Sequence, residues 1–110
     1  MNTAQLLKQA IGLHQSGQLA EAAEIYNQVL QAEPDNVDAL NLLGAILMVA
    51  GQLDAAIELT GKAVALDPQY FAPYVNLGNA LQAANRLEEA ADALAKALAI
   101  NPGSAAAAAN

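Results

Sequence analysis

Residues 37–70 read VDALNLLGAILMVAGQLDAAIELTGKAVALDPQY, and residues 71–104 read FAPYVNLGNALQAANRLEEAADALAKALAINPGS. The two stretches align without a gap, so the sequence repeats itself after 34 residues. Pro34, Pro68 and Pro102 hold the same place in three successive copies. Because self-similarity at a fixed period of this length is typical of stacked repeats, the sequence predicts a repeat array.

The same register holds at apolar and small positions along the whole chain. Three of these sets are Leu13, Leu47 and Leu81; Leu19, Leu53 and Leu87; and Ala22, Ala56 and Ala90. We therefore divide the chain into repeats at residues 3–36, 37–70 and 71–104. Residues 105–110 are expected to be a tail or the truncated start of a further helix.

Each repeat is predicted to contain two helices. In the second repeat Asn36 is a suitable N-cap for a helix over residues 37–50, which Gly51 would end in a left-handed conformation. A second helix is expected over residues 53–66, before Asp67 and Pro68. Gly17 and Asn85 hold the turn position of Gly51 in the other repeats, and both residue types tolerate a positive φ.

Small residues recur where paired helices are expected to cross. Gly44, Gly78 and Ala10 share one place on the first helices, and an alanine recurs on each second helix, at Ala22, Ala56 and Ala90. A leucine at any of these places would overpack the contact by roughly 1–3 kcal/mol.

The third repeat carries the full pattern in Tyr74, Leu77, Gly78, Leu81, Ala90, Leu94, Ala97 and Pro102. The second repeat matches it at Leu40, Leu43, Gly44, Leu47, Ala56, Ala63 and Pro68, with Thr60 in place of a large residue. The first repeat deviates most, with Gln9 and Ala10 for Leu-Gly and Val29 for alanine. The pattern resembles the tetratricopeptide repeat, which implies an all-α fold in which three helix–turn–helix repeats form a right-handed superhelix.

Composition excludes several functions. The net charge is −7 with only four Lys and Arg residues, so the chain lacks the cationic stripe of a nucleic-acid binder or an anionic-membrane binder. The uncharged residues 39–53 are too few to span a membrane, for which roughly 20 are needed. Without cysteine or a recognisable signal peptide, the expected location is the cytoplasm.

Residues with catalytic chemistry are sparse, so we expect no enzyme activity, cofactor or metal. The single histidine, His14, has no cysteine or second histidine to work with, and a surface or groove position is the simpler interpretation. Glu24, Glu58 and Asp92 recur at one place near the start of each second helix. There they complement the helix dipole, and copies one repeat apart are too distant for one ion.

The family resemblance implies a ligand groove on the concave surface, lined by the first helix of each repeat. Carried over place by place, the predicted groove residues are Leu7, Ile11, His14, Asn41, Leu42, Ala45, Met48, Val75, Asn76, Asn79 and Gln82. Apolar side chains would form the floor, and the amides would suit the backbone of an extended peptide. Some relatives clamp a C-terminal carboxylate, but the matching places here, Leu7, Ile11, Leu42, Ala72 and Asn76, are not cationic, so we predict no such clamp.

Two segments resemble particular groups of tetratricopeptide repeat proteins. Residues 74–81 look like repeats of O-linked N-acetylglucosamine transferases, whose inner face carries a ladder of asparagines, of which Asn76 fits one rung. Residues 13–22 are similar to the opening of large bacterial repeat proteins, in which such an array often precedes a transferase domain.

The last predicted helix, residues 87–100, has only a narrow polar stripe, whereas terminal repeats usually present a polar outer face. This favours either a fragment of a longer array or self-association through that helix. The leading hypothesis is a protein-interaction scaffold that binds a peptide or helix in the concave groove. The alternatives are the recruiting domain of a larger, glycosyltransferase-like enzyme and a self-associating structural module.

Overall fold

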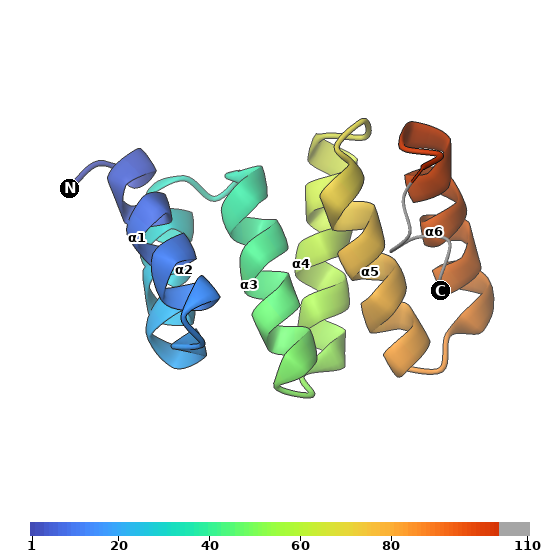
Figure 1. The fold of residues 1–110 in the computed structure, drawn as a ribbon, viewed down its shortest axis with the longest axis horizontal. Coiled ribbons are helices and arrows are strands. Elements are labelled where there is room, and N and C mark those ends of the chain that lie inside the picture. The colour runs from blue at the N-terminus through green and yellow to red at the C-terminus, as the bar shows by residue number, and fades with distance from the viewer. Residues whose placement is uncertain (104–110) are drawn as a thin grey trace.

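The computed structural model describes residues 1–103, and within them the chain forms helices and connecting turns without a strand. The helices are α1 (Thr3–Gln15), α2 (Leu19–Ala32), α3 (Val37–Val49), α4 (Leu53–Leu66), α5 (Phe71–Ala83) and α6 (Leu87–Ile100) (Figure 1). The predicted tail at residues 105–110 lies outside the described residues.

Successive helices pack side by side in a row that runs from α1 to α6 (Figure 1). The first helices, α1, α3 and α5, each pack against the second helix that follows them, and α3 also contacts α5 directly. The row measures 39 × 26 × 23 Å. The all-α repeat solenoid expected from the sequence is therefore the observed architecture.

The connections between helices follow the predicted turn chemistry. Gly17 and Gly51 have φ values of 83° and 82°, and Asn85 has a φ of 63°. The Asn36 side chain accepts a hydrogen bond of 3.0 Å from the backbone N–H of Ala39, as expected of an N-cap. Helix α3 ends at Val49, one residue before the predicted end, and the other two predicted helix spans, 53–66 and 87–100, match α4 and α6.

The predicted small residues lie where the paired helices cross closely. A Cβ atom added to Gly44 would lie 2.6 Å from Cγ2 of Thr60, and one added to Gly78 would lie 2.6 Å from Cγ of Leu94. Ala10, at the same place in the first repeat, is fully buried. These pairs hold each first helix against its second helix.

Within residues 1–103, no helix combines the length and the apolar character that crossing a membrane requires.

Candidate binding surface

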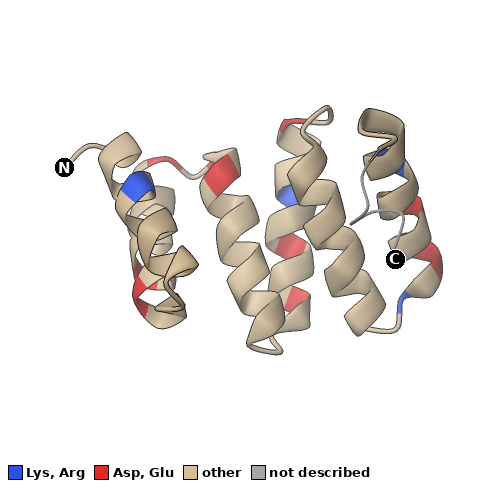
Figure 2. Ribbon diagram, viewed as in Figure 1, with Lys and Arg blue, Asp and Glu red and all other residues tan. Residues whose placement is uncertain are grey.

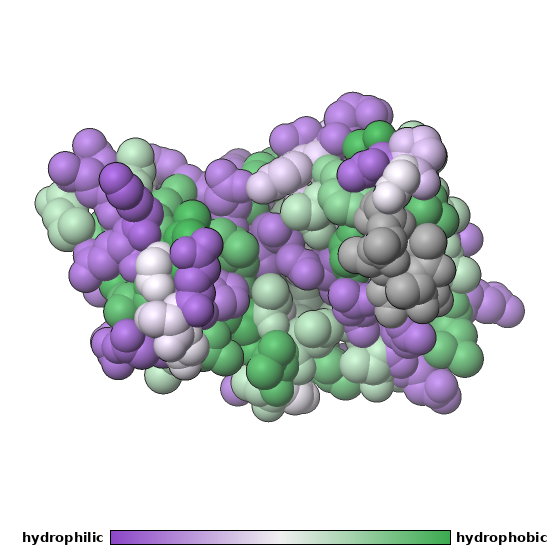
Figure 3. All heavy atoms as spheres, in the orientation of Figure 1, coloured by the Kyte–Doolittle hydropathy of each residue, from purple (hydrophilic) through white to green (hydrophobic). Residues whose placement is uncertain are grey.

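The side of the molecule formed by α1, α3 and α5, called here the first-helix face, is almost free of charge. The chain has four basic and eleven acidic residues, and of these only Lys8 and Asp38 lie in the first helices. The other charged residues belong to the second helices and the connecting turns (Figure 2). Viewed from the side shown in Figure 3, apolar and hydrophilic surface alternate over these helices. This face is therefore suited to uncharged ligand groups.

Most of the predicted groove residues are partly accessible on the first-helix face. Half-buried positions are held by Leu7, Ile11, His14, Leu42, Ala45, Met48, Val75, Asn76 and Asn79, and Gln82 is exposed. Asn41 differs from the rest, because only 3% of its surface is exposed.

Asn41 joins two repeats through its side chain. Its Oδ1 atom accepts a hydrogen bond of 2.6 Å from Nδ2 of Asn76, which lies on α5. The prediction that all four amides of the groove offer free donors and acceptors therefore does not describe Asn41. Asn79 and Gln82 have no side-chain hydrogen-bond partner within residues 1–103.

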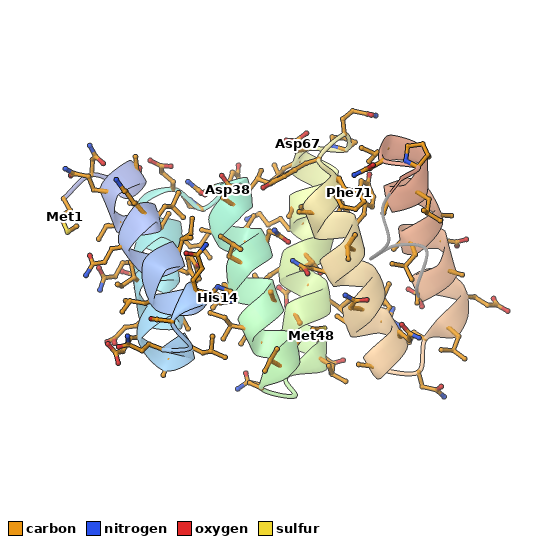
Figure 4. The ribbon with its side chains drawn as sticks, in the orientation of Figure 1. Met1, His14, Asp38, Met48, Asp67 and Phe71 are labelled. Atoms are coloured by element: carbon orange, nitrogen blue, oxygen red, sulfur yellow. The ribbon has the colours of Figure 1, made fainter. Side chains whose placement is uncertain are left out.

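A hollow opens between α1 and α3, and we call it the α1–α3 hollow. It has a volume of about 260 Å³ and is lined by Ile11, His14, Gln15, Tyr26 and Leu42. It thus brings together three of the predicted site residues, and in Figure 4 His14 lies between α1 and α3. The hollow occurs where the repeats pack less closely, because α2 and α3 are in less extensive contact than α4 and α5.

Tyr26 was not predicted to be part of the site. Its hydroxyl lies 3.1 Å from Nδ1 of His14, and the two rings meet edge to face with centroids 6.0 Å apart. Burial raises the pKa of Tyr26 above its ordinary value of 10.0, so the hydroxyl is neutral at physiological pH. Tyr26 occupies the place of Thr60 and Leu94 in the other repeats. Of these three side chains, only that of tyrosine carries a hydroxyl far enough from the backbone to reach His14 on α1, and this difference was the available sequence signal.

Acidic residues gather at the end of the molecule where α3 and α5 begin. This acidic edge consists of Glu33, Asp35, Asp38 and Asp67, and Figure 4 shows Asp38 and Asp67 on the same side. The Tyr70 hydroxyl donates a 2.8 Å hydrogen bond to Asp38, and burial, followed by this bond, raises the pKa of Tyr70.

An ion pair and hydrogen bonds connect the acidic edge to α4 and to α1. Lys62 forms an ion pair of 3.3 Å with Asp35, which offsets one of the negative charges. Hydrogen bonds from Thr3 and then Asn36 lower the pKa of Glu33. Asp38 and Asp67 have no cation within ion-pair distance in residues 1–103.

The remaining titratable side chains of the described residues lack the geometry of metal ligands. Among residues 1–103 no three His, Asp or Glu side chains are close enough to hold a metal ion. The recurring acids Glu24, Glu58 and Asp92 are exposed on the second helices.

Comparison with solved structures identifies the same architecture elsewhere. An O-GlcNAc transferase of Thermobaculum terrenum is 36% identical with a TM-score of 0.90 over 92% of this chain, which spans 19% of that protein. A TPR protein of Thermus thermophilus is 25% identical with a TM-score of 0.89, covering 96% of this chain and 60% of that one. The first TPR of Spaghetti (RPAP3), bound to an HSP90 peptide, is similar in fold, with 23% identity, a TM-score of 0.92, and coverage of 97% and 85%.

No curated protein sequence gives a significant match. The tetratricopeptide repeat family model matches residues 13–62 and again residues 48–110, which together make up most of the chain. The protein therefore belongs to the tetratricopeptide repeat family.

Proposed function

We propose that the first-helix face binds a segment of a partner protein, either an extended peptide or one face of a helix. The observation that carries this proposal is the near absence of charge on a surface that combines partly accessible apolar side chains with free amides. Leu7, Met48 and Val75 supply apolar contact, and Asn79 and Gln82 supply donors and acceptors for a peptide backbone.

The similar structures support a role in protein interaction. In the Spaghetti complex the same fold carries an HSP90 peptide. A peptide ligand is therefore compatible with this architecture. The chain has no cationic residue at the places where relatives clamp a carboxylate, so the ligand chemistry proposed here is different.

A pull-down with matched charge variants tests the face. Met48→Asp places a charge on the first-helix face, and Leu87→Asp places the same charge on α6, where Leu87 is 57% exposed. Proteins captured from an extract of the source organism should be lost with Met48→Asp and kept with Leu87→Asp. Equal recovery with both variants, each shown to be folded by circular dichroism, would contradict the assignment.

A second candidate is that the array is the recruiting region of a larger enzyme. The match to the O-GlcNAc transferase favours it, because 92% of this chain corresponds to 19% of that protein. In this case the repeats would select a substrate protein and a separate domain would perform the chemistry. The reading frame on both sides of residues 1–110 decides between the two: a transferase domain in the same polypeptide would support recruitment, and a full-length polypeptide without one would exclude it.

Self-association through α6 is a third candidate function. Helix α6 exposes small apolar side chains at Ala91, Ala95 and Ala99 between its charged residues. Sedimentation velocity over a wide range of protein concentration would support this alternative if the apparent mass rises, and would exclude it if the protein stays monomeric.

The cytoplasm is the proposed location, to be checked by cell fractionation.

A further inference from the structure

We infer that the α1–α3 hollow holds one apolar side chain from an internal, basic segment of the partner. This inference rests on the proposed function of the first-helix face. It adds the chemistry of the partner: an anchor of the leucine, methionine or phenylalanine type, with a lysine or arginine close to it and without a free carboxylate.

The size of the hollow suits a single side chain. Its volume of about 260 Å³ lies below the roughly 300–1,000 Å³ of pockets that enclose a small-molecule ligand. Because the hollow is also open toward the first-helix face, a chain that passes over this face can insert one residue while its backbone stays outside.

The lining of the hollow favours an apolar group. Ile11 and Leu42 form its walls, and none of its lining residues is an aspartate, glutamate, lysine or arginine. A carboxylate placed there would lose its hydration without gaining a cation, which is costly. Two other hollows, of about 240 and 280 Å³, lie near α6, and both are lined in part by Lys96. The α1–α3 hollow is thus the most apolar of these three hollows.

The polar atoms of the hollow are arranged so that an apolar anchor leaves few of them unpaired. The Tyr26 hydroxyl and Nδ1 of His14 already bond to each other. The second ring nitrogen of His14 and the exposed amide of Gln15 make no hydrogen bond within residues 1–103. The backbone of a bound segment offers N–H and C=O partners to both groups.

Charge complementarity indicates which residue type lies next to the anchor in the partner segment. Asp38 lies four residues before Leu42, which places both on one side of α3 about 6 Å apart along the helix. Asp38 bonds to a neutral tyrosine, and no cation pairs with it in residues 1–103. A lysine or arginine next to the anchor would therefore meet the acidic edge, and the net charge of −7 would attract a basic segment and repel an acidic one.

Selection from a phage library of random peptides of about 12 residues, displayed without free C-termini, provides the probe. We expect enriched sequences to contain a leucine, methionine or phenylalanine next to a lysine or arginine. A synthetic peptide of the consensus should bind equally well as a C-terminal amide and as a free acid in calorimetry. Replacing its anchor by aspartate should weaken binding by at least about tenfold, and this comparison leaves the protein unchanged.

Protein variants and NMR then locate the contact. Leu42→Asp should abolish binding of the consensus peptide, Leu87→Asp should not change it, and Asp38→Asn should weaken it and reduce its dependence on salt. The methyl signals of Ile11 and Leu42 should shift when the peptide is added, and the methyl signals of Leu87 should not.

Different results overturn different statements. If the methyl signals of Val75 and Met48 shift while those of Ile11 and Leu42 do not, the first-helix face binds peptide and the hollow does not hold the anchor. Enriched peptides that are acidic, or that need a free carboxylate, would overturn the inference and leave the proposed function standing. Peptides that shift only signals of α2, α4 and α6, or a selection that enriches no peptide, would contradict both.

Discussion

Nδ2 of Asn76 on α5 donates a hydrogen bond of 2.6 Å to Oδ1 of Asn41 on α3, across the junction of two repeats. The bond is sheltered, because Asn41 is 3% exposed. Loss of a sheltered bond costs more than loss of an exposed one, since the remaining polar group keeps its desolvation penalty. The pair therefore contributes to the stability of the array at the junction of α3 and α5.

Removing one partner of this pair should destabilise the fold. Asn76→Ala leaves the buried Oδ1 of Asn41 without its donor, and we expect a loss of about 1–3 kcal/mol in the free energy of unfolding. Urea unfolding of Asn76→Ala, Asn41→Ala and the double variant measures the coupling between them. A double variant whose loss equals the sum of the two single losses would show that the bond contributes nothing.

One added methyl group should destabilise both close helix crossings, at Gly44 and at Gly78. In Gly78→Ala the new Cβ meets Cγ of Leu94 at 2.6 Å, and because Cγ is the branch point of that side chain it cannot move independently. We expect destabilisation of about 1–3 kcal/mol. In Gly44→Ala the clash is with Cγ2 of Thr60 at 2.6 Å, so Thr60→Ser should relieve it.

Two other glycines provide matched controls. Gly12 and Gly61 also lie inside helices, and a Cβ added to either meets nothing within 4 Å. Alanine there should stabilise the protein by roughly 0.5–1 kcal/mol because the helix propensity improves. If Gly78→Ala gave the same gain in thermal unfolding as Gly12→Ala, the proposed overpacking would be refuted.

The turn after α5 gives a third prediction. Asn85 has a φ of 63°, a conformation that costs a side chain with a Cβ roughly 1–2 kcal/mol unless local hydrogen bonds compensate. Asn85→Ala should therefore lower the thermal midpoint, and Asn85→Gly should leave it equal or raise it. A midpoint for Asn85→Ala at or above that of Asn85→Gly would show that the turn is not strained.

These examples show which features the sequence could predict. The 34-residue register specifies small residues and turn residues because each repeat imposes the same backbone geometry on them. Gly51, Asn85 and Gly44 could therefore be assigned before the structure was known. The cap at the start of α1 was not predicted, although Asn2 and Gln5 form a capping box there.

The parts of the site that escaped prediction arise from contacts between repeats. Asn41 has a place on the first helix that suggests access to ligand, but its burial depends on how closely α5 approaches α3. Tyr26 is a fully buried residue of α2 that lines the α1–α3 hollow, and a repeat register does not report the spacing of neighbouring repeats that leaves this hollow. Local pattern determines the helices, whereas packing distances determine which side chains a ligand can reach.

Alkaline pH should weaken the fold through Tyr26. Burial raises the pKa of Tyr26 in the folded protein above 10.0, so folding favours the neutral hydroxyl. The resulting stability is complete below the unfolded pKa and is lost as pH rises through the folded value. Between about pH 9 and pH 11 the wild-type protein should lose more free energy of unfolding than Tyr26→Phe, which has no ionising group at this position.

Tyr26→Phe also removes the hydroxyl that contacts His14, so its stability at neutral pH should be lower by about 0.5–1.5 kcal/mol. The free energies of unfolding of the two proteins should therefore converge as pH rises, because only the wild-type protein has an ionisable phenol at position 26. Tyr70→Phe should show a similar convergence, because burial and then the bond to Asp38 raise the pKa of Tyr70 as well, although its hydroxyl lies at the acidic edge and away from the hollow. Parallel curves for the wild-type protein and Tyr26→Phe would mean that this phenol ionises as readily in the folded chain as in the unfolded one, and that the floor of the α1–α3 hollow is open to water.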